Sequence, residues 1–209
     1  MICDLHIHTN LSDGKSTFNE VIERSMKNNV KIISITDHNR IDNYYNLIKP
    51  ADLKIINGVE ISVLYNNYEY HFLMYGFDPY NKHIIKYNND SIKHSKKNFN
   101  NYCISLEELF ELEHNTNSIV SLAHPTKYFN NIDEIEKFIL FLKKEYNLRA
   151  VECYNTSASV EQQDKLIKIS NKHDLYISGG SDYHGKPPRE IGYANRLIYK
   201  DYLSILNIL

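Results

Sequence analysis

The chain contains 209 residues with a formal net charge of −2, and 42% of its residues are hydrophobic and 24% charged. This composition is typical of a globular protein and excludes a chain that is disordered throughout. The near-neutral charge gives no support for a surface that coats nucleic acid. Three cysteines without a CxxC pair exclude a disulfide framework and a thiolate zinc finger.

The length suits one domain, so we expect residues 1–209 to form a single unit. The first residues, Met1 to His8, are too polar for an export signal. No apolar run approaches the roughly 18 residues of a membrane span. We therefore expect a cytoplasmic protein with no membrane partner, while the sequence leaves its oligomeric state open.

Seven short apolar runs rich in β-branched residues predict seven strands. Several are nearly continuous Ile, Val and Leu, which is typical of strands that are buried on both faces. The predicted strands are Ile2–Ile7, Lys31–Thr36, Lys54–Ile61, Glu69–Gly76, Ser118–Ala123, Ala150–Tyr154 and Tyr176–Gly180. Asn66 and Asn67, between Val63–Tyr65 and Tyr68–Tyr70, predict a hairpin.

Helical patterns separate several of these strands. A capping box at Thr17–Glu20 begins the first of them. Ile132–Tyr146 and Ser159–His173 each carry an apolar stripe, and the second stripe consists of Val160, Leu166, Ile167 and Ile169. This alternation predicts an α/β fold with a mainly parallel sheet, either an open doubly wound sheet or a closed barrel. No GxGxxG follows the first strand, so no dinucleotide-binding loop is predicted.

Residues 78–117 form the least regular part of the chain and are rich in Asn, Lys and Tyr. We expect a small surface excursion there, with one helix near Ser105–Glu113. It could shape a substrate entrance or simply be a solvated helix and loop.

Six of the ten histidines lie within a predicted strand or at its carboxyl end, namely His6, His8, His38, His71, His124 and His184. Four carboxylates accompany them: Asp4, Asp13, Glu60 and Asp182. Parallel α/β sheets carry their chemistry at the carboxyl ends of strands, and a His-x-His pair on a strand sends both imidazoles to the same side. Imidazoles with carboxylates suit Zn²⁺, Mn²⁺ or Fe²⁺. The candidate ligands outnumber those of one tetrahedral ion, which predicts a cluster of two or three ions bridged by Glu60 or another carboxylate.

Some of these residues have a second interpretation. Asp4 could ligate a metal or hold a ligand imidazole, and Asp13 could belong to a simple turn. Cys153 could reach the site, although a small buried hydrophobe fits it better. The remaining histidines, which we expect at the surface, are His83, His94, His114 and His173.

Six short motifs together resemble the PHP (polymerase and histidinol phosphatase) family. In chain order they are Asp4-Leu5-His6-Ile7-His8-Thr9, Ser12-Asp13-Gly14, Thr36-Asp37-His38, Gly58-Val59-Glu60, Ala123-His124-Pro125 and Ser181-Asp182-Tyr183-His184-Gly185. Each motif alone is weak, but their order is that of the family and they span nearly the whole chain. The resemblance implies a distorted (β/α)7 TIM-like barrel with a trinuclear metal site, and the seven predicted strands agree with it.

The resemblance also implies a set of ligands. The first metal would take His6, His8, Glu60 and Asp182. The second would share Glu60 and add His71 and His124. The third would take Asp13, His38 and His184. Some members use a further ligand from the sixth strand, and the sequence leaves open whether Glu152, Cys153 or Asn155 approaches the metals here.

We expect the protein to be a metal-dependent phosphoesterase, most simply a phosphatase for small phosphorylated molecules. A metal-activated hydroxide would attack phosphorus. Asp182 or a site histidine such as His184 would pass a proton to the leaving oxygen. Arg189, five residues after His184, is the first candidate to bind the phosphate, Arg40 the second and Lys127 the third, although each could be an ordinary surface cation.

Two other functions remain open. The same metals could serve an oligonucleotide phosphodiesterase or nuclease, for which Lys93–Lys97 with Phe99 and Tyr102 offers only a faint basic and aromatic patch. Nucleic acid is therefore the less favoured partner. A catalytically silent, metal-stabilised binding module would be expected to lose several ligands, yet every candidate position here holds a competent one.

Overall fold

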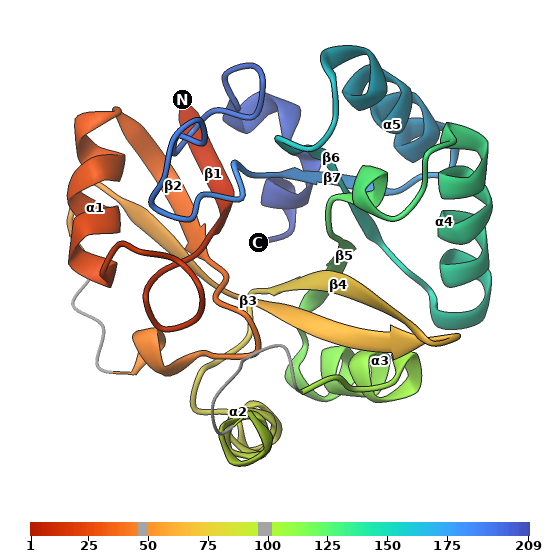
Figure 1. Cartoon of the computed structure of the whole chain (residues 1–209), viewed down its shortest axis with the longest axis horizontal. Coiled ribbons are helices and arrows are strands. Elements are labelled where there is room, and N and C mark those ends of the chain that lie inside the picture. Colours follow the sequence, from red (N-terminus) through yellow and green to blue (C-terminus); the bar gives the residue numbers. More distant parts are fainter. Residues whose placement is uncertain (46–49, 96–101) are drawn as a thin grey trace.

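The computed structural model describes residues 1–45, 50–95 and 102–209. Seven strands form one sheet in the order of the sequence, and the helices lie outside them (Figure 1). The strands are β1 (Ile2–Ile7), β2 (Val30–Ile35), β3 (Lys54–Tyr65), β4 (Tyr68–Tyr75), β5 (Ile119–Leu122), β6 (Ala150–Tyr154) and β7 (Tyr176–Gly179). All seven predicted strands are confirmed, with ends that differ by a few residues.

The sheet is parallel except at β4, which is antiparallel to both β3 and β5. Asn66 and Asn67 form the predicted hairpin turn, and Tyr65 pairs with Tyr68 across it. Both asparagines have positive φ, +50° and +64°, as a tight two-residue turn requires. A connection this short cannot cross over to a parallel strand, so β4 must run against β3.

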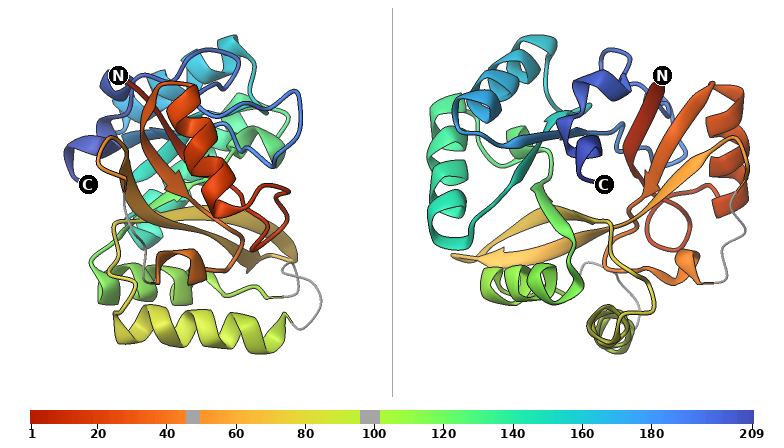
Figure 2. Two further views of the ribbon diagram at one scale, coloured as in Figure 1. Left: turned by 90° about the vertical axis from the view of Figure 1, so that its left-hand side faces the viewer. Right: turned by 180° about the vertical axis from the view of Figure 1, so that it is seen from behind.

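The sheet curves into a distorted barrel, as the resemblance implied. Beyond β7 the chain returns to β1, where Ile7 and Tyr183 form a parallel bridge and the His8 N–H donates to the Tyr183 carbonyl at 2.8 Å. Gly180 permits this approach, because a Cβ there would lie 2.3 Å from the backbone nitrogen of His6. The chain after β7 also passes the start of β1, where the Lys200 N–H donates to the Met1 carbonyl at 2.8 Å (Figure 2).

We predict that Gly180→Ala lowers the free energy of unfolding by about 1–3 kcal/mol, because the added methyl would overlap the β1 backbone. Urea denaturation measures this loss. Lys31→Ala, at an exposed position on β2, is the control and should leave the midpoint nearly unchanged. Equal midpoints for the two variants would contradict this account of barrel closure.

In the described ranges five α-helices cover the barrel: α1 (Phe18–Lys27), α2 (Lys82–His94), α3 (Leu106–Thr116), α4 (Ile132–Tyr146) and α5 (Val160–Lys172). The short helical turns are η1 (Asp42–Tyr44), η3 (Pro125–Lys127), η4 (Lys200–Tyr202) and η5 (Ser204–Asn207). The capping box predicted at Thr17–Glu20 is present and begins α1. Among the described residues, every helix is too short or too polar to cross a membrane.

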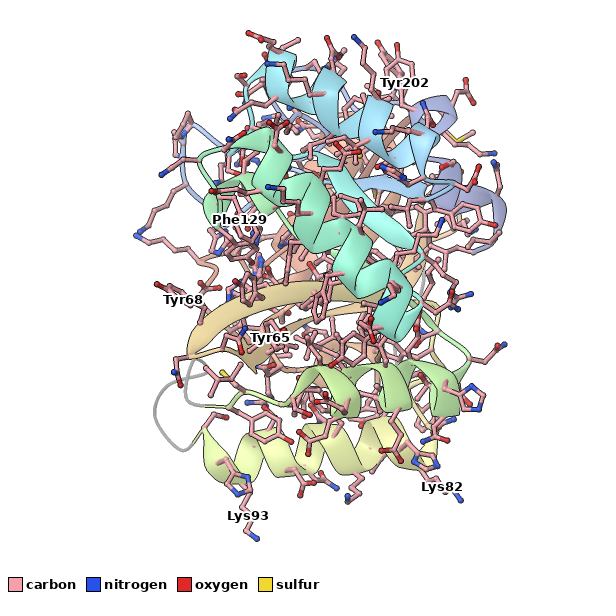
Figure 3. All side chains as sticks on the ribbon, turned by 90° about the vertical axis from the view of Figure 1, so that its right-hand side faces the viewer. Tyr65, Tyr68, Lys82, Lys93, Phe129 and Tyr202 are labelled. Atoms are coloured by element: carbon pink, nitrogen blue, oxygen red, sulfur yellow. The ribbon has the colours of Figure 1, made fainter. Side chains whose placement is uncertain are left out.

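Two expectations about the helices are wrong. Val160 is 44% exposed, because the buried stripe of α5 begins one turn later, at Gln163. The excursion holds two helices, α2 and α3, packed side by side, rather than one (Figure 3). α2 was missed because half of its buried face is polar, with Asn88 and Ser91 beside Ile84 and Tyr87.

The excursion is more than a surface loop, since α3 packs on β3 and Leu109 is fully buried. Lys93, at the end of α2, is exposed. Three members of the faint basic and aromatic patch, Lys96, Lys97 and Phe99, lie outside the described residues. The expected surface histidines are confirmed as exposed or partly exposed, namely His83, His94, His114 and His173.

Candidate metal centre

The predicted ligands gather at one end of the barrel. Most follow the carboxyl ends of parallel strands. His71 reaches the same end from the first half of β4, because β4 is antiparallel and His71 pairs with Ser62, two residues after Glu60. The cavity there has a volume of about 450 Å³ and is lined by Asp13, His38, Glu60, Glu69, His71, His124, Lys127, Tyr128, Asp182, His184 and Arg189.

Glu60 lies at the centre of this cluster and is 1% exposed. Within 2.8–3.4 Å of its two carboxylate oxygens lie ring nitrogens of five imidazoles, those of His6, His8, His38, His71 and His124. Burial favours a neutral carboxyl, but the imidazoles, His38 and His6 foremost, hold the pKa of Glu60 well below its ordinary value. Glu60 is therefore ionised and accepts contacts through both oxygens.

Asp182 and Asp13 extend the cluster on either side. Oδ1 of Asp182 lies 3.4 Å from Nε2 of His8 and 3.5 Å from Nε2 of His6. The carboxylate of Asp13 lies 3.2–3.8 Å from ring nitrogens of His8, His38 and His184. Burial would raise the pKa of Asp13, but the hydrogen bond from His184 and the other imidazoles hold it well below its ordinary value.

The turn that carries Asp13 is held by Asp37, the residue before His38. The Asp37 carboxylate accepts hydrogen bonds from the Thr9 N–H, the Thr9 hydroxyl and the Ser12 hydroxyl, each at 2.7 Å. Ser12-Asp13-Gly14 is therefore more than a simple turn, because its backbone is fixed where Asp13 faces the imidazoles.

Two site residues have left-handed backbone conformations, with φ +27° at His124 and +54° at Asp182. Residues other than glycine seldom adopt them, and they persist where the surroundings hold the chain, often at functional sites. At His124 this support comes from Glu152, whose Oε2 accepts the His124 N–H at 2.7 Å.

The donor set fits divalent metal ions. The nine predicted ligands form four overlapping groups, and within each group the ligand atoms lie within 4.8 Å of one another. Nε2 of His6 and Nε2 of His8 are only 3.1 Å apart in a fully buried place. Within the part of the chain that the structure describes, three buried ring nitrogens, the Nδ1 atoms of His8, His38 and His124, have no hydrogen-bond partner. Buried imidazoles converging on carboxylates are typical of Zn²⁺, Mn²⁺ and Fe²⁺ sites.

We predict that metal binding releases protons. Burial alone would lower the pKa of every site imidazole, and at His38 and His124 it does. At three others the neighbouring carboxylates outweigh burial, so that the pKa of His6 is well above its ordinary value and those of His8 and His71 rise to about 9. Metals bind neutral imidazole, so loading the metal-free protein at pH 7 should release protons, and affinity should fall as the pH falls. Calorimetric titration in two buffers of different ionisation enthalpy measures the release. Identical heats in both buffers would contradict the prediction.

Two further buried carboxylates lie beside the ligands, Glu152 on β6 and Asp4 on β1. Glu152 is fully buried, and its Oε1 lies 2.9 Å from Nδ1 of His6. Asp4 takes neither of its expected roles, since it lies outside the four groups and accepts the backbone N–H groups of His6, Ser181 and Gly192. It therefore ties β1 to the chain that follows β7.

The other two candidates, Cys153 on β6 and Asn155 directly after it, do not join the cluster. Sγ of Cys153 lies 3.2 Å from the Ser170 hydroxyl on α5, and burial raises the pKa of this thiol to about 12. Cys153 is thus the buried small residue that was expected. Asn155 donates a hydrogen bond to the Glu152 carbonyl at 3.2 Å.

The three candidate phosphate-binding cations differ in placement. Nη1 of Arg189 and Nζ of Lys127 lie 3.0 Å and 2.8 Å from Oδ2 of Asp182, and both side chains line the cavity. Arg40 does not line it, because its Nε donates to Asp42 at 2.8 Å. Burial would raise the pKa of Asp182, but His6, His8 and Lys127 hold it well below its ordinary value. An ionised carboxylate has no proton to give, which favours His184 over Asp182 as a proton donor.

Residues 4–179 match the PHP domain family. The chain belongs to the PHP family. The match covers the motifs up to the end of β7, and Asp182 and His184 follow it directly.

Two relatives of known name are similar along much or part of this chain. The 3′,5′-nucleoside bisphosphate phosphatase of Chromobacterium violaceum is 22% identical, and the alignment covers 93% of this chain and 92% of the relative. The 5′-3′ exoribonuclease of Escherichia coli is 34% identical over 37% of this chain and 28% of the relative.

Solved structures show the same fold. An amidohydrolase from Chromobacterium violaceum with bound sulfate and no metal has a TM-score of 0.83 at 20% identity, covering 100% of this chain and 95% of that one. A protein from Bifidobacterium adolescentis, inferred to be a metal-dependent phosphoesterase, has a TM-score of 0.78 at 20% identity, covering 99% and 95%. The family and these relatives identify this PHP protein as a metal-dependent hydrolase of phosphate esters, as the sequence predicted, and argue against a silent binding module.

Proposed function

We propose that this PHP protein is a phosphatase for small phosphorylated molecules and that its nine clustered side chains hold two or three divalent ions, Mn²⁺, Zn²⁺ or Fe²⁺. The observation that carries the metal centre is the position of Glu60, a buried carboxylate in contact with five imidazoles. A buried charge with this many ligand-type neighbours is costly unless it serves to bind a cation.

The contacts favour a particular sharing of ligands. One group contains His6, His8 and Asp182 around Oε2 of Glu60. His71 and His124 both contact Oε1 of Glu60, although the distance groups place His124 with His6 and His71 with His38. A further group contains Asp13, His38 and His184, together with His8. Glu60 would therefore bridge the first two ions.

Bound ions would supply a water of lowered pKa and positive charge for the phosphoryl oxygens. The chain's own residues then have separate tasks. Arg189 and Lys127, on the cavity side of Asp182, would bind the phosphoryl oxygens and stabilise their charge in the transition state. With two ions bound at Glu60, His184, 23% exposed at the cavity, would be free to pass a proton to the leaving oxygen, whereas a third ion would take it as a ligand.

Two observations favour a small substrate over a nucleic acid. The phosphatase relative matches along nearly its whole length, whereas the exoribonuclease matches over 28% of its length. The cavity of about 450 Å³ also suits a small molecule. The nuclease remains the second candidate because that partial match carries the higher identity, 34%.

We further propose that the whole chain works as one catalytic domain in the cytoplasm. Asp182 and His184 bring residues after β7 into the site, and η5 packs on β7 at the other end of the barrel. Three unpaired cysteines are in keeping with a reducing compartment.

Phosphate release separates the two candidate functions. Protein loaded with Mn²⁺, Zn²⁺ or Fe²⁺ is given an aryl phosphate, a nucleoside monophosphate, a nucleoside bisphosphate and a short single-stranded DNA. We expect turnover of the monoesters and little cleavage of the DNA. Faster cleavage of the DNA than of every monoester would favour the nuclease instead.

A further inference from the structure

A fourth carboxylate enters the cavity and takes no part in the groups described above. Glu69 lies on β4 two residues before His71, so both side chains project from the same face of the strand. Its side chain is 36% exposed and lines the cavity. The neighbouring Tyr68 is 70% exposed at the tip of the hairpin (Figure 3).

The charge of Glu69 is unfavourable for the substrate. A carboxylate that lines a phosphate-binding cavity repels the anion that the cavity must admit. Its position therefore needs an explanation other than substrate binding. Glu69 contacts a candidate ligand instead, because its Oε1 lies 3.0 Å from Nε2 of His71.

His6 shows what such a contact does in this site. Its Nδ1 faces Glu152 at 2.9 Å, while its Nε2 faces Glu60 at 3.1 Å. With the proton on Nδ1, the lone pair of Nε2 is left free for a metal next to Glu60. A carboxylate on the outer nitrogen thus fixes the tautomer of a ligand histidine and increases its basicity.

His71 has the same arrangement with the two nitrogens exchanged. Its Nδ1 lies 3.1 Å from Oε1 of Glu60, and its Nε2 faces Glu69. The backbone of His71 is also fixed, because its N–H donates a hydrogen bond to the Tyr128 hydroxyl at 2.8 Å. His71 is 23% exposed, so without Glu69 its outer nitrogen would face the cavity and solvent.

We propose that Glu69 is a positioning residue that keeps the proton of His71 on Nε2, so that His71 binds the ion beside Oε1 of Glu60 through Nδ1. This is the opposite nitrogen from that used by His6. The inference rests on the proposed metal centre and adds to it a residue that orients one ligand without touching an ion.

The test compares metal binding by four proteins: wild type, Glu69→Ala, Glu69→Gln and the control Glu111→Ala, which removes an exposed carboxylate on α3. Elemental analysis counts the ions, and competition with a chelator measures their affinities. We expect Glu69→Ala to weaken one ion by about 10–100-fold while the others and the control keep wild-type affinity. Glu69→Gln should lie between them, because its amide oxygen still accepts the Nε2 hydrogen.

A tautomer measurement gives a second readout that does not depend on turnover. In zinc-loaded protein with ¹⁵N-labelled histidine, we expect His71 to show a protonated Nε2 and a metal-bound Nδ1 in the wild type. Metal bound to Nε2 of His71, or equal affinities for every ion in wild type and Glu69→Ala, would overturn the inference while leaving the metal centre intact. A wild-type protein that binds no ion would overturn the metal centre itself, and this inference with it.

Discussion

Replacing Glu60 with glutamine should abolish phosphate release. The two side chains have the same shape, but the amide carries no negative charge and offers one oxygen instead of two. It cannot bridge two ions, and it faces five imidazoles that are arranged around a carboxylate. Losing the bridged ions should remove several kcal/mol of transition-state stabilisation. This corresponds to a fall in kcat/KM of at least about 10³-fold.

The measurement is kcat/KM for an aryl phosphate, with ions per chain determined on the same sample. Thermal melting of the metal-free variant shows whether it folds. His8→Ala, which removes an imidazole 3.0 Å from the same carboxylate, should also lose activity. Activity of Glu60→Gln within tenfold of wild type, in a folded protein, would contradict a central role for Glu60.

Arg189→Ala and Lys127→Ala should each reduce kcat by about 10²-fold, because each removes one charged group from the place where the phosphoryl oxygens would lie. Both cations lie on Oδ2 of Asp182 in the structure, within 3.0 Å. Their removal also leaves the Asp182 carboxylate facing the incoming anion, which adds repulsion and should raise KM.

Arg40→Ala is the matched control for these substitutions. Arg40 is two residues from the candidate ligand His38, yet its guanidinium pairs with Asp42 and does not line the cavity. Its removal should change kcat and KM little. A larger loss for Arg40→Ala than for Arg189→Ala would mean that the phosphate binds on the other side of the cavity.

The strands and the clustering of the site residues could be predicted because both depend on local pattern. Buried strands appear in the sequence as apolar runs. The residues that follow parallel strands meet at one edge of the sheet, whatever the details of packing. Thus His6, His124 and Asp182, far apart in the sequence, could be placed together. The direction of β4 follows from the short Asn66-Asn67 turn, and it explains how His71 reaches this edge from within a strand.

The residues that support the site could not be predicted in this way. The resemblance left Glu152 open beside Cys153 and Asn155, and its contact with His6 selects it. Glu69 is identified only by what it faces along its strand, because no local pattern distinguishes it from other glutamates. Arg40, the second candidate, lies only two residues from a predicted ligand in the sequence, but Asp42 pairs with its guanidinium. Pairing between side chains is decided by the folded geometry, which sequence spacing does not contain.

The most direct test of the metal-dependent phosphatase is one sample measured twice. Protein is treated with a chelator, its metal content is determined, and phosphate release from an aryl phosphate is followed before and after Mn²⁺, Zn²⁺ or Fe²⁺ is returned. We predict no bound ion and no release after chelation, and recovery of activity as two or three ions per chain bind again. Undiminished phosphate release from protein that holds no divalent ion would contradict the account.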